Sequence, residues 1–224
     1  MADLKNRGKY ESEFARKVSS LMGRHRRDLA TLLGSPPDLS NVPESFWSKV
    51  QKETEEEISA VLLLIFLASS SQHSPADSGA IFQGFVSRDG EQWSGSRSKT
   101  LASGYVQNSR ERLGQLGQKW AENPETPKSE ISQDLISLFG PDRAEGIAIT
   151  ESTNAISAGG ESAVRQSGGI SPEDIWITER DARVCPICSP LDGTSRAVWS
   201  LKFPSGPPAH PRCRCYLRYK NEKQ

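Results

Sequence analysis

All four cysteines of the chain lie between residues 185 and 215, and no other feature of the sequence constrains its fold as much. They occur as Cys185-Pro-Ile-Cys188, then twenty-one residues, then His210-Pro-Arg-Cys213-Arg-Cys215. A Cys-x-x-Cys turn presents two thiolates to one ion, and a second pair from a distant segment completes a tetrahedron. Thiolate and imidazole ligands suit zinc. The sequence therefore predicts a structural zinc site near the C-terminus.

Five candidate ligands compete for the four places of this site. Cys185 and Cys188 are the first pair, and the other two ligands come from His210, Cys213 and Cys215. If Cys213 and Cys215 lie on one strand, side-chain alternation points them in the same direction. This argument favours the all-cysteine set, with His210 beside it. A short tail with few apolar residues cannot bury enough surface to fold alone, so we expect the metal to supply the missing stability.

Three other interpretations of the same cysteines compete with the zinc site. Disulfides between the first and second pair would form in oxidising surroundings. A redox-active Cys-x-x-Cys requires a strand-to-helix setting, which a segment rich in Pro and Gly does not offer. The third arrangement is four free cysteines within a small core.

The rest of the chain is predicted to be helical up to about residue 168. Apolar residues recur there at helical spacing, and Pro and Gly divide the pattern into separate helices. The low apolar content of 35% and the mean hydropathy of −0.57 suggest that part of the chain is extended, solvated or buried only against a partner. The expected helices span residues 10–33, 43–69, 99–122, 127–139 and 142–166.

Two segments depart from this helical pattern. Residues 69–98 are dense in Ser, Gly, Asp and Pro, which predicts a loop with at most one short helical turn. After Gly168-Gly169, residues 175–177 and 215–219 read as short strands. The predicted fold class is mainly α, with an elongated helical body followed by a small α+β C-terminal module that carries the Cys/His site.

No membrane contact is expected. The longest apolar run, residues 60–68, is shorter than the ~20 residues that a membrane span needs. We expect this run to be buried against a neighbouring helix or another subunit. The first twenty residues are polar and charged, without the apolar region of a signal peptide, so synthesis in the cytoplasm is expected.

The formal net charge is zero, but the charges are unevenly distributed. Residues 1–27 contain eight Lys/Arg against three Asp/Glu, residues 176–224 contain nine against four, and the middle is acidic. Basic ends can contact DNA phosphates or an acidic protein surface, or can simply be solvated. The candidate phosphate-contacting residues are Arg24, Arg26, Arg27, Arg212 and Arg214.

Nothing in the sequence indicates an enzyme or a small-molecule substrate. It lacks a phosphate-cradling Gly loop, a nucleophile elbow and a His-Glu-x-x-His pair. Asp181 and Asp192 flank the Cys-x-x-Cys turn without a nucleophile or base beside them, so we expect structural roles, with Asp192-Gly193 in a turn. Glu151 either pairs with an arginine of the tail or is solvated.

Three motifs resemble those of one family, the Mu F-like phage head-morphogenesis proteins. The stretch from Arg143 reads Arg-Ala-Glu-Gly-Ile-Ala-Ile-Thr-Glu-Ser-Thr and is similar to the family's Arg-Ala-x-x-Ile-Ala-x-Thr-Glu-Thr helix. Residues 176–193 resemble its Trp-x-Thr-x-x-Asp-x-Arg-Val-Cys-x-x-Cys-x-x-Leu-Asp-Gly signature, and residues 207–215 resemble its Pro-Pro-x-His-Pro-x-Cys-Arg-Cys ending. The motif residues outside the Cys/His set are Glu151, Trp176, Asp181, Asp192 and Gly193.

This resemblance implies a minor capsid protein of a tailed phage, located in the virion inside the head or at the portal. The expected partners are the portal protein, the major capsid protein or both, and the expected role lies in head assembly, genome packaging or ejection. Association with packaged DNA is implied as well. The alternatives are a DNA-binding virion protein delivered with the genome and a metal-dependent enzyme. The implied division is a helical region at 1–139, a Mu F-like domain at 140–217 and a basic tail at 218–224.

Overall fold

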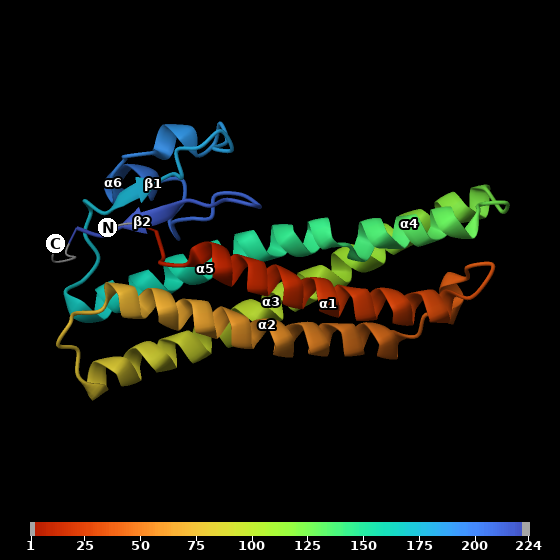
Figure 1. Cartoon of the computed structure of the whole chain (residues 1–224), viewed down its shortest axis with the longest axis horizontal. Coiled ribbons are helices and arrows are strands. Elements are labelled where there is room, and N and C mark those ends of the chain that lie inside the picture. The colour runs from red at the N-terminus through yellow and green to blue at the C-terminus, as the bar shows by residue number, and fades with distance from the viewer. Residues whose placement is uncertain (1–2, 221–224) are drawn as a thin grey trace.

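Five helices form an elongated body, and a small module sits at one end of it (Figure 1). This computed structural model describes residues 3–220. A 3-10 turn, Leu39–Asn41, joins the first two helices. The expected fold class, a helical body followed by an α+β module, is confirmed. The helices are α1 (Arg7–Leu33), α2 (Glu44–His73), α3 (Ala80–Glu122), α4 (Lys128–Phe139) and α5 (Pro141–Ser167).

The body is organised around α5, which packs against α1, α2 and α3. At its crossing with α2 the two backbones touch, because a Cβ placed on Gly159 would lie 2.2 Å from the carbonyl oxygen of Phe66. Two buried serines of α2 donate hydrogen bonds across the same crossing, Ser69 to the carbonyl of Ile156 at 2.7 Å and Ser70 to that of Gly159 at 2.9 Å. A glycine that weakens an isolated helix therefore permits the closest helix contact of this crossing.

The expected loop at residues 69–98 was wrong, because α3 begins at Ala80 and continues without a break to Glu122. Its small residues lie four apart, and Ser94, Ser98 and Ala102 are buried. The serine hydroxyls donate to carbonyls of their own helix, Ser94 to Glu91 and Ser98 to Gly95. Low intrinsic helix propensity was overridden by packing against α2 and α5, which is where most helical stability in proteins arises.

The apolar run of α2 lies mostly inside the body. Val61, Leu62, Ile65 and Phe66 are buried, which confirms the expected burial against neighbouring helices. Leu64, by contrast, is 53% exposed, and Ala60 at the start of the run is exposed as well. Among the described residues, no helix combines the length and the apolar character that crossing a membrane requires.

The C-terminal module consists of β1 (Ile175–Ile177), a 3-10 turn (Ser189–Leu191), α6 (Arg196–Trp199) and β2 (Tyr216–Arg218). The strands pair antiparallel, with Trp176 opposite Leu217. Both strands had been expected, and β1 has the predicted bounds.

The module has a core of its own, so the expectation of a tail almost without a core needs correction. Trp176 is fully buried and stacks edge-on against Trp199 at 5.8 Å between ring centroids. Leu217 and three of the four cysteines join this cluster, which extends onto Val164 of α5. The cysteines are thus part of the packing itself.

The module continues past the expected start of the basic tail at residue 218. Arg218 belongs to β2, Tyr219 is buried, and the backbone N–H of Lys220 donates to Asp174 at 3.0 Å. The remaining residues of that predicted tail, 221–224, lie outside the described part of the chain.

Two Gly→Ala substitutions should have opposite effects on stability. Gly159→Ala forces a methyl group into the Phe66 backbone and should lower the free energy of unfolding by about 1–3 kcal/mol. Gly104→Ala, in α3 with nothing within 4 Å of the new Cβ, should raise it by about 0.5–1 kcal/mol. Urea denaturation measures both, and equal shifts would contradict the close α2–α5 crossing.

Candidate metal centre

The four cysteines and His210 converge on one small region of the module. Two groups of three ligand atoms lie within 4.8 Å of one another, Cys185 with Cys188 and His210, and Cys188 with Cys213 and Cys215. Cys188 belongs to both groups, so the five donors lie next to one another. The cavity between them has a volume of about 20 Å³, which is close to the size of a single water-sized sphere. The cluster can hold one metal ion.

The sulfur positions match a metal site better than a disulfide. All four cysteines are free, and the sulfurs of Cys188 and Cys213 are 3.7 Å apart. A disulfide would place them at about 2.05 Å. Two sulfurs on a tetrahedral zinc ion lie about 3.8 Å apart, given Zn–S distances of about 2.3 Å.

His210 is a member of the cluster and not an outlying residue. Its Nε2 atom lies 2.9 Å from the sulfur of Cys185 and 3.2 Å from that of Cys188. Its Nδ1 atom is 2.7 Å from the carbonyl oxygen of Pro211. A carbonyl can only accept, so Nδ1 carries the proton, and the lone pair of Nε2 is directed at the sulfurs. Metal-binding histidines usually have this second hydrogen bond.

The thiols of the cluster differ in their acidity. The hydrogen bond from Cys215 lowers the pKa of Cys213 to about 5. Burial raises the pKa of Cys188 to about 12, and donation to Cys213 raises the pKa of Cys215 above its ordinary value. Of the three buried thiols only Cys213 has a lowered pKa, because negative charges on adjacent sulfurs repel one another and disfavour a second thiolate. A bound cation would remove that repulsion.

Local turns bring the two halves of the cluster together. The N–H groups of Cys188 and Ser189 donate to the carbonyl of Cys185 at 3.1 and 2.9 Å, which closes the Cys-x-x-Cys turn. Cys213 donates its N–H to the carbonyl of His210 at 3.2 Å. Both Cys213 and Cys215 precede β2, which begins at Tyr216. Strand alternation therefore does not govern these two cysteines, and that argument for the all-cysteine set no longer holds.

A buried arginine from the other end of the chain ties the cluster to the helical body. Arg7, at the start of α1, donates to the carbonyl of Arg214 at 2.8 Å and to the hydroxyl of Thr153 at 2.5 Å. Thr153, on α5, donates in turn to the carbonyl of Cys213 at 2.6 Å. Asp3 and Glu11 neutralise the guanidinium at 3.2 and 2.7 Å. In the sequence, Arg7 was only one of the eight basic residues at 1–27, because no local pattern signals a contact across two hundred residues.

Glu151 was expected to pair with an arginine of the tail or to be solvated, and both expectations were wrong. It is buried in α5 and accepts two hydrogen bonds of 2.7 Å from Arg97 of α3. The pKa of Arg97 is raised by this fork-shaped contact. The pair joins two helices of the body, because a planar guanidinium matches both carboxylate oxygens.

The two aspartates beside the Cys-x-x-Cys turn have structural contacts. Asp181 accepts from Arg214 at 2.7 Å, and this contact lowers its pKa to about 2. Asp192 accepts from the N–H of Thr178 and from Arg180, both at 2.9 Å. Gly193 has a φ of +78°, which glycine adopts without strain, and its N–H donates to the carbonyl of Trp176. These contacts support the structural interpretation.

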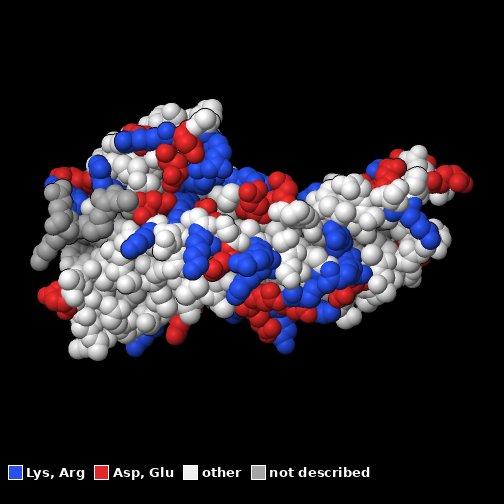
Figure 2. Space-filling model, in the orientation of Figure 1, with Lys and Arg blue, Asp and Glu red and all other residues white. Residues whose placement is uncertain are grey.

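Three of the five arginines proposed for nucleic acid are engaged by carboxylates. Arg24 pairs with Glu57. Arg214 pairs with Asp181, and Arg212 binds Asp142 at 2.7 Å and Glu145 at 3.0 Å. Neither Arg26 nor Arg27 has an ion pair within residues 3–220. On the face drawn in Figure 2, basic side chains of the module and of the middle of the body lie next to acidic ones.

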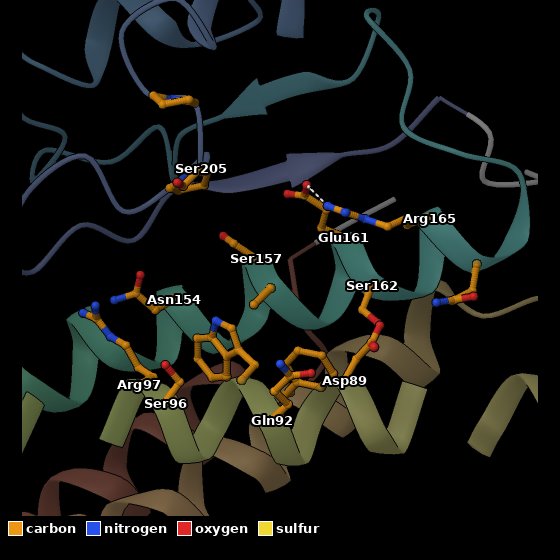
Figure 3. Close-up of a pocket in the computed structure, with 16 residues that line it drawn as sticks. Asp89, Gln92, Ser96, Arg97, Asn154, Ser157, Glu161, Ser162, Arg165 and Ser205 are labelled. Carbon is orange, nitrogen blue, oxygen red and sulfur yellow. Dashed lines mark hydrogen bonds and ion pairs between the residues drawn. The ribbon is translucent and has the colours of Figure 1, made fainter. Parts of the chain in front are cut away.

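A polar cleft of about 800 Å³ separates the module from the body and is lined by α3, α5 and the 204–207 loop (Figure 3). Its charged groups are paired internally: Asp89 accepts from Ser162 at 2.7 Å, and Arg165 pairs with Glu161 at 3.0 Å. The hydroxyl of Ser157 is buried without a hydrogen-bond partner. Four serines and the carboxylates of Asp89 and Glu161 are among the residues that line the cleft.

Comparison with known proteins supports the family suggested by the motifs. The model of the family described as Phage Mu protein F like protein matches residues 114–218, so this part of the chain is Mu F-like. The match includes α4, α5 and the whole Cys/His cluster, and it starts within α3. No curated protein and no solved structure matches the chain.

Replacing Arg7 should loosen the metal centre from the body without unfolding the helices. Arg7→Met leaves Asp3, Glu11 and the Arg214 carbonyl without their buried donor, at a cost of about 3–5 kcal/mol. We expect faster amide hydrogen exchange at residues 213–218, with α2 and α3 unchanged. Lys9→Met, on the same helix but exposed, is the control. Unchanged hydrogen exchange at residues 213–218 in Arg7→Met would show that Arg7 does not hold the metal centre to the body.

Proposed function

From the Mu F-like segment we infer that the chain is a minor head protein of a tailed bacteriophage, acting in head assembly at the portal or the inner capsid wall. The observation that carries this proposal is the family match over residues 114–218, which contains all three motifs in order. The elongated body supports it, because a long helical bundle offers extended surfaces to neighbouring subunits.

An apolar end of the body supports contact with another head protein, either the portal protein or the major capsid protein. Residues 58–87 contain a single Asp, Glu, Lys or Arg, which is Asp77. Leu64, Ile81 and Phe85 are exposed there, at the α2–α3 hairpin. Figure 2 shows this end as a broad surface with few charges. Exposed apolar patches of this kind commonly mark protein interfaces.

The metal centre is proposed to hold one zinc ion through Cys185, Cys188, His210 and Cys213. The lone pair of His210 Nε2 and the thiolate character of Cys213 support this set. Cys215 would then remain a thiol and donate to the Cys213 thiolate. Bound zinc would stabilise the module, because its ligands come from two segments that only the folded chain brings together.

A structural rather than an enzymatic role is part of this proposal. Four protein ligands close a tetrahedral zinc site, whereas a catalytic zinc keeps one position open for water or substrate. The internally paired charges of the polar cleft are consistent with the same view.

A second candidate function is DNA binding inside the virion. Lys9, Arg16 and Arg27 are exposed, and their spacing of seven and eleven residues aligns them on one face of α1. None of the three has an ion pair among the described residues. Binding through this row would weaken steeply with salt, with a log–log slope of about −0.9 for each phosphate contacted. Salt-independent binding would remove this candidate.

Zinc analysis of two single variants discriminates between the ligand sets. Cys215→Ser should retain about one zinc per chain, whereas His210→Ala should lose it or bind it at least about tenfold more weakly. The all-cysteine set predicts the reverse. Native mass spectrometry of the purified protein measures the stoichiometry. Cys188→Ser, which removes the shared ligand, is the positive control for loss.

The virion proposal is tested by quantifying the chain in purified phage heads. An immunoblot calibrated with the purified protein should find a few copies per particle, retained after DNA is removed by nuclease and salt. Absence from the heads would overturn the proposal. If the chain leaves the heads together with the DNA, the DNA-binding candidate is favoured.

A further inference from the structure

A second cavity lies at the opposite end of the body from the metal centre. It is a groove of about 380 Å³ between the C-terminal part of α1, the loop that follows it, and α4 (Figure 1). Its walls combine apolar residues with three cations, and none of its lining residues is acidic. The lining residues that carry the argument are Arg26, Arg27, Ala30, Lys128, Ile131 and Leu135.

The three cations of this groove are unpaired in the described part of the chain. Arg26, Arg27 and Lys128 form no ion pair or side-chain hydrogen bond within the described residues. This contrasts with cations nearby on the same helices or beside them: Arg24 pairs with Glu57, and Lys119 pairs with Glu130 and Asp134. Their positive charge is therefore available to a partner.

The composition of the groove defines what would fill it. An apolar floor gains free energy only from apolar side chains, at roughly 25 cal/mol per Å² buried. The cations at its rim favour carboxylates. A DNA backbone would satisfy the cations, but it would leave the exposed Ala30 and the half-buried Ile131 in contact with water. In the acidic stretch of α2, Glu53 contacts His25, Glu57 pairs with Arg24 and Glu56 lies 3.9 Å from Lys52, so among the described residues a second copy would offer Glu55 alone as an unpaired carboxylate for three cations.

We propose that this groove binds an acidic amphipathic helix of another head protein, with two or three apolar side chains in the groove and carboxylates on Arg26, Arg27 and Lys128. Helix-in-groove recognition uses apolar anchors at i, i+3 or i+4, and i+7. A cavity of about 380 Å³ falls within the range of roughly 300–1,000 Å³ typical of binding pockets. The identity of the partner as a head protein rests on the proposed function, whereas the chemistry of the groove does not.

A direct test uses the purified full-length chain and a fluorescein-labelled helical peptide, with Leu on one face and Glu on the other. Fluorescence anisotropy should show binding that Arg26→Glu with Lys128→Glu weakens by about tenfold or more. Ala30→Trp should weaken it similarly, because the exposed Ala30 lines the groove and a larger side chain fills it. Arg16→Glu, an exposed cation of α1 outside the groove, is the matched charge control and should change binding less than about twofold.

Three results would overturn the proposal that the groove binds an acidic helix. These are no binding of the peptide, equal weakening by Arg16→Glu, and full binding by Ala30→Trp. The last two would indicate charge attraction alone, as DNA would show. Circular dichroism melts confirm that each variant is folded.

Photo-crosslinking in purified phage heads then identifies the head protein that supplies the helix. A benzoylphenylalanine at Ala30 should crosslink to a segment with Asp or Glu and apolar residues at helical spacing, whereas one at the exposed Ser20 should not. A crosslink to DNA or to a second copy would overturn the proposal. If the chain is absent from heads while the peptide binds in solution, the proposed function is wrong, but the groove still binds an acidic helix.

Discussion

The guanidinium of Arg7 determines where the C-terminal module sits. It reaches from the first turn of α1 to the backbone between Cys213 and Cys215, and Thr153 of α5 completes the link. A buried charge of this kind persists only when its donors are occupied, and here two carboxylates and two neutral oxygens occupy them. The two ends of the chain and the central helix thus share one polar contact. The metal centre is held against the bundle by the backbone of its own ligands.

Small residues allow the helices of the body to pack closely, whereas Arg7 links the module to the body. Gly159 lets α5 touch the backbone of α2, and the serines of α2 convert that proximity into hydrogen bonds. Large apolar side chains such as Phe14, Leu62 and Phe139 fill the rest of the core. At the α2–α3 hairpin, by contrast, Ile81 and Phe85 remain on the surface.

The proposed interactions are distributed along the length of the molecule. The metal centre is at one end, the apolar α2–α3 hairpin lies near it, and the cationic groove between α1 and α4 is at the other end (Figure 1). Separate contact surfaces on a stiff body suit a protein that bridges neighbouring subunits.

Local chemistry in the sequence was enough to determine the helix ends at Pro and Gly, the strand at Ile175–Ile177, the family motifs and the convergence of the Cys/His cluster. The helix ends, the strand and the Cys-x-x-Cys turn depend on neighbours a few residues apart, whereas the convergence of the two halves of the cluster was predicted from the ligand types and their spacing. Only the tertiary structure decided that residues 80–98 are helical, that Glu151 faces Arg97, and that Arg7 is buried. The physical reason is common to all three. Each is stabilised by a partner far away in the chain, and the free energy of that contact exceeds the local preference that a sequence pattern records.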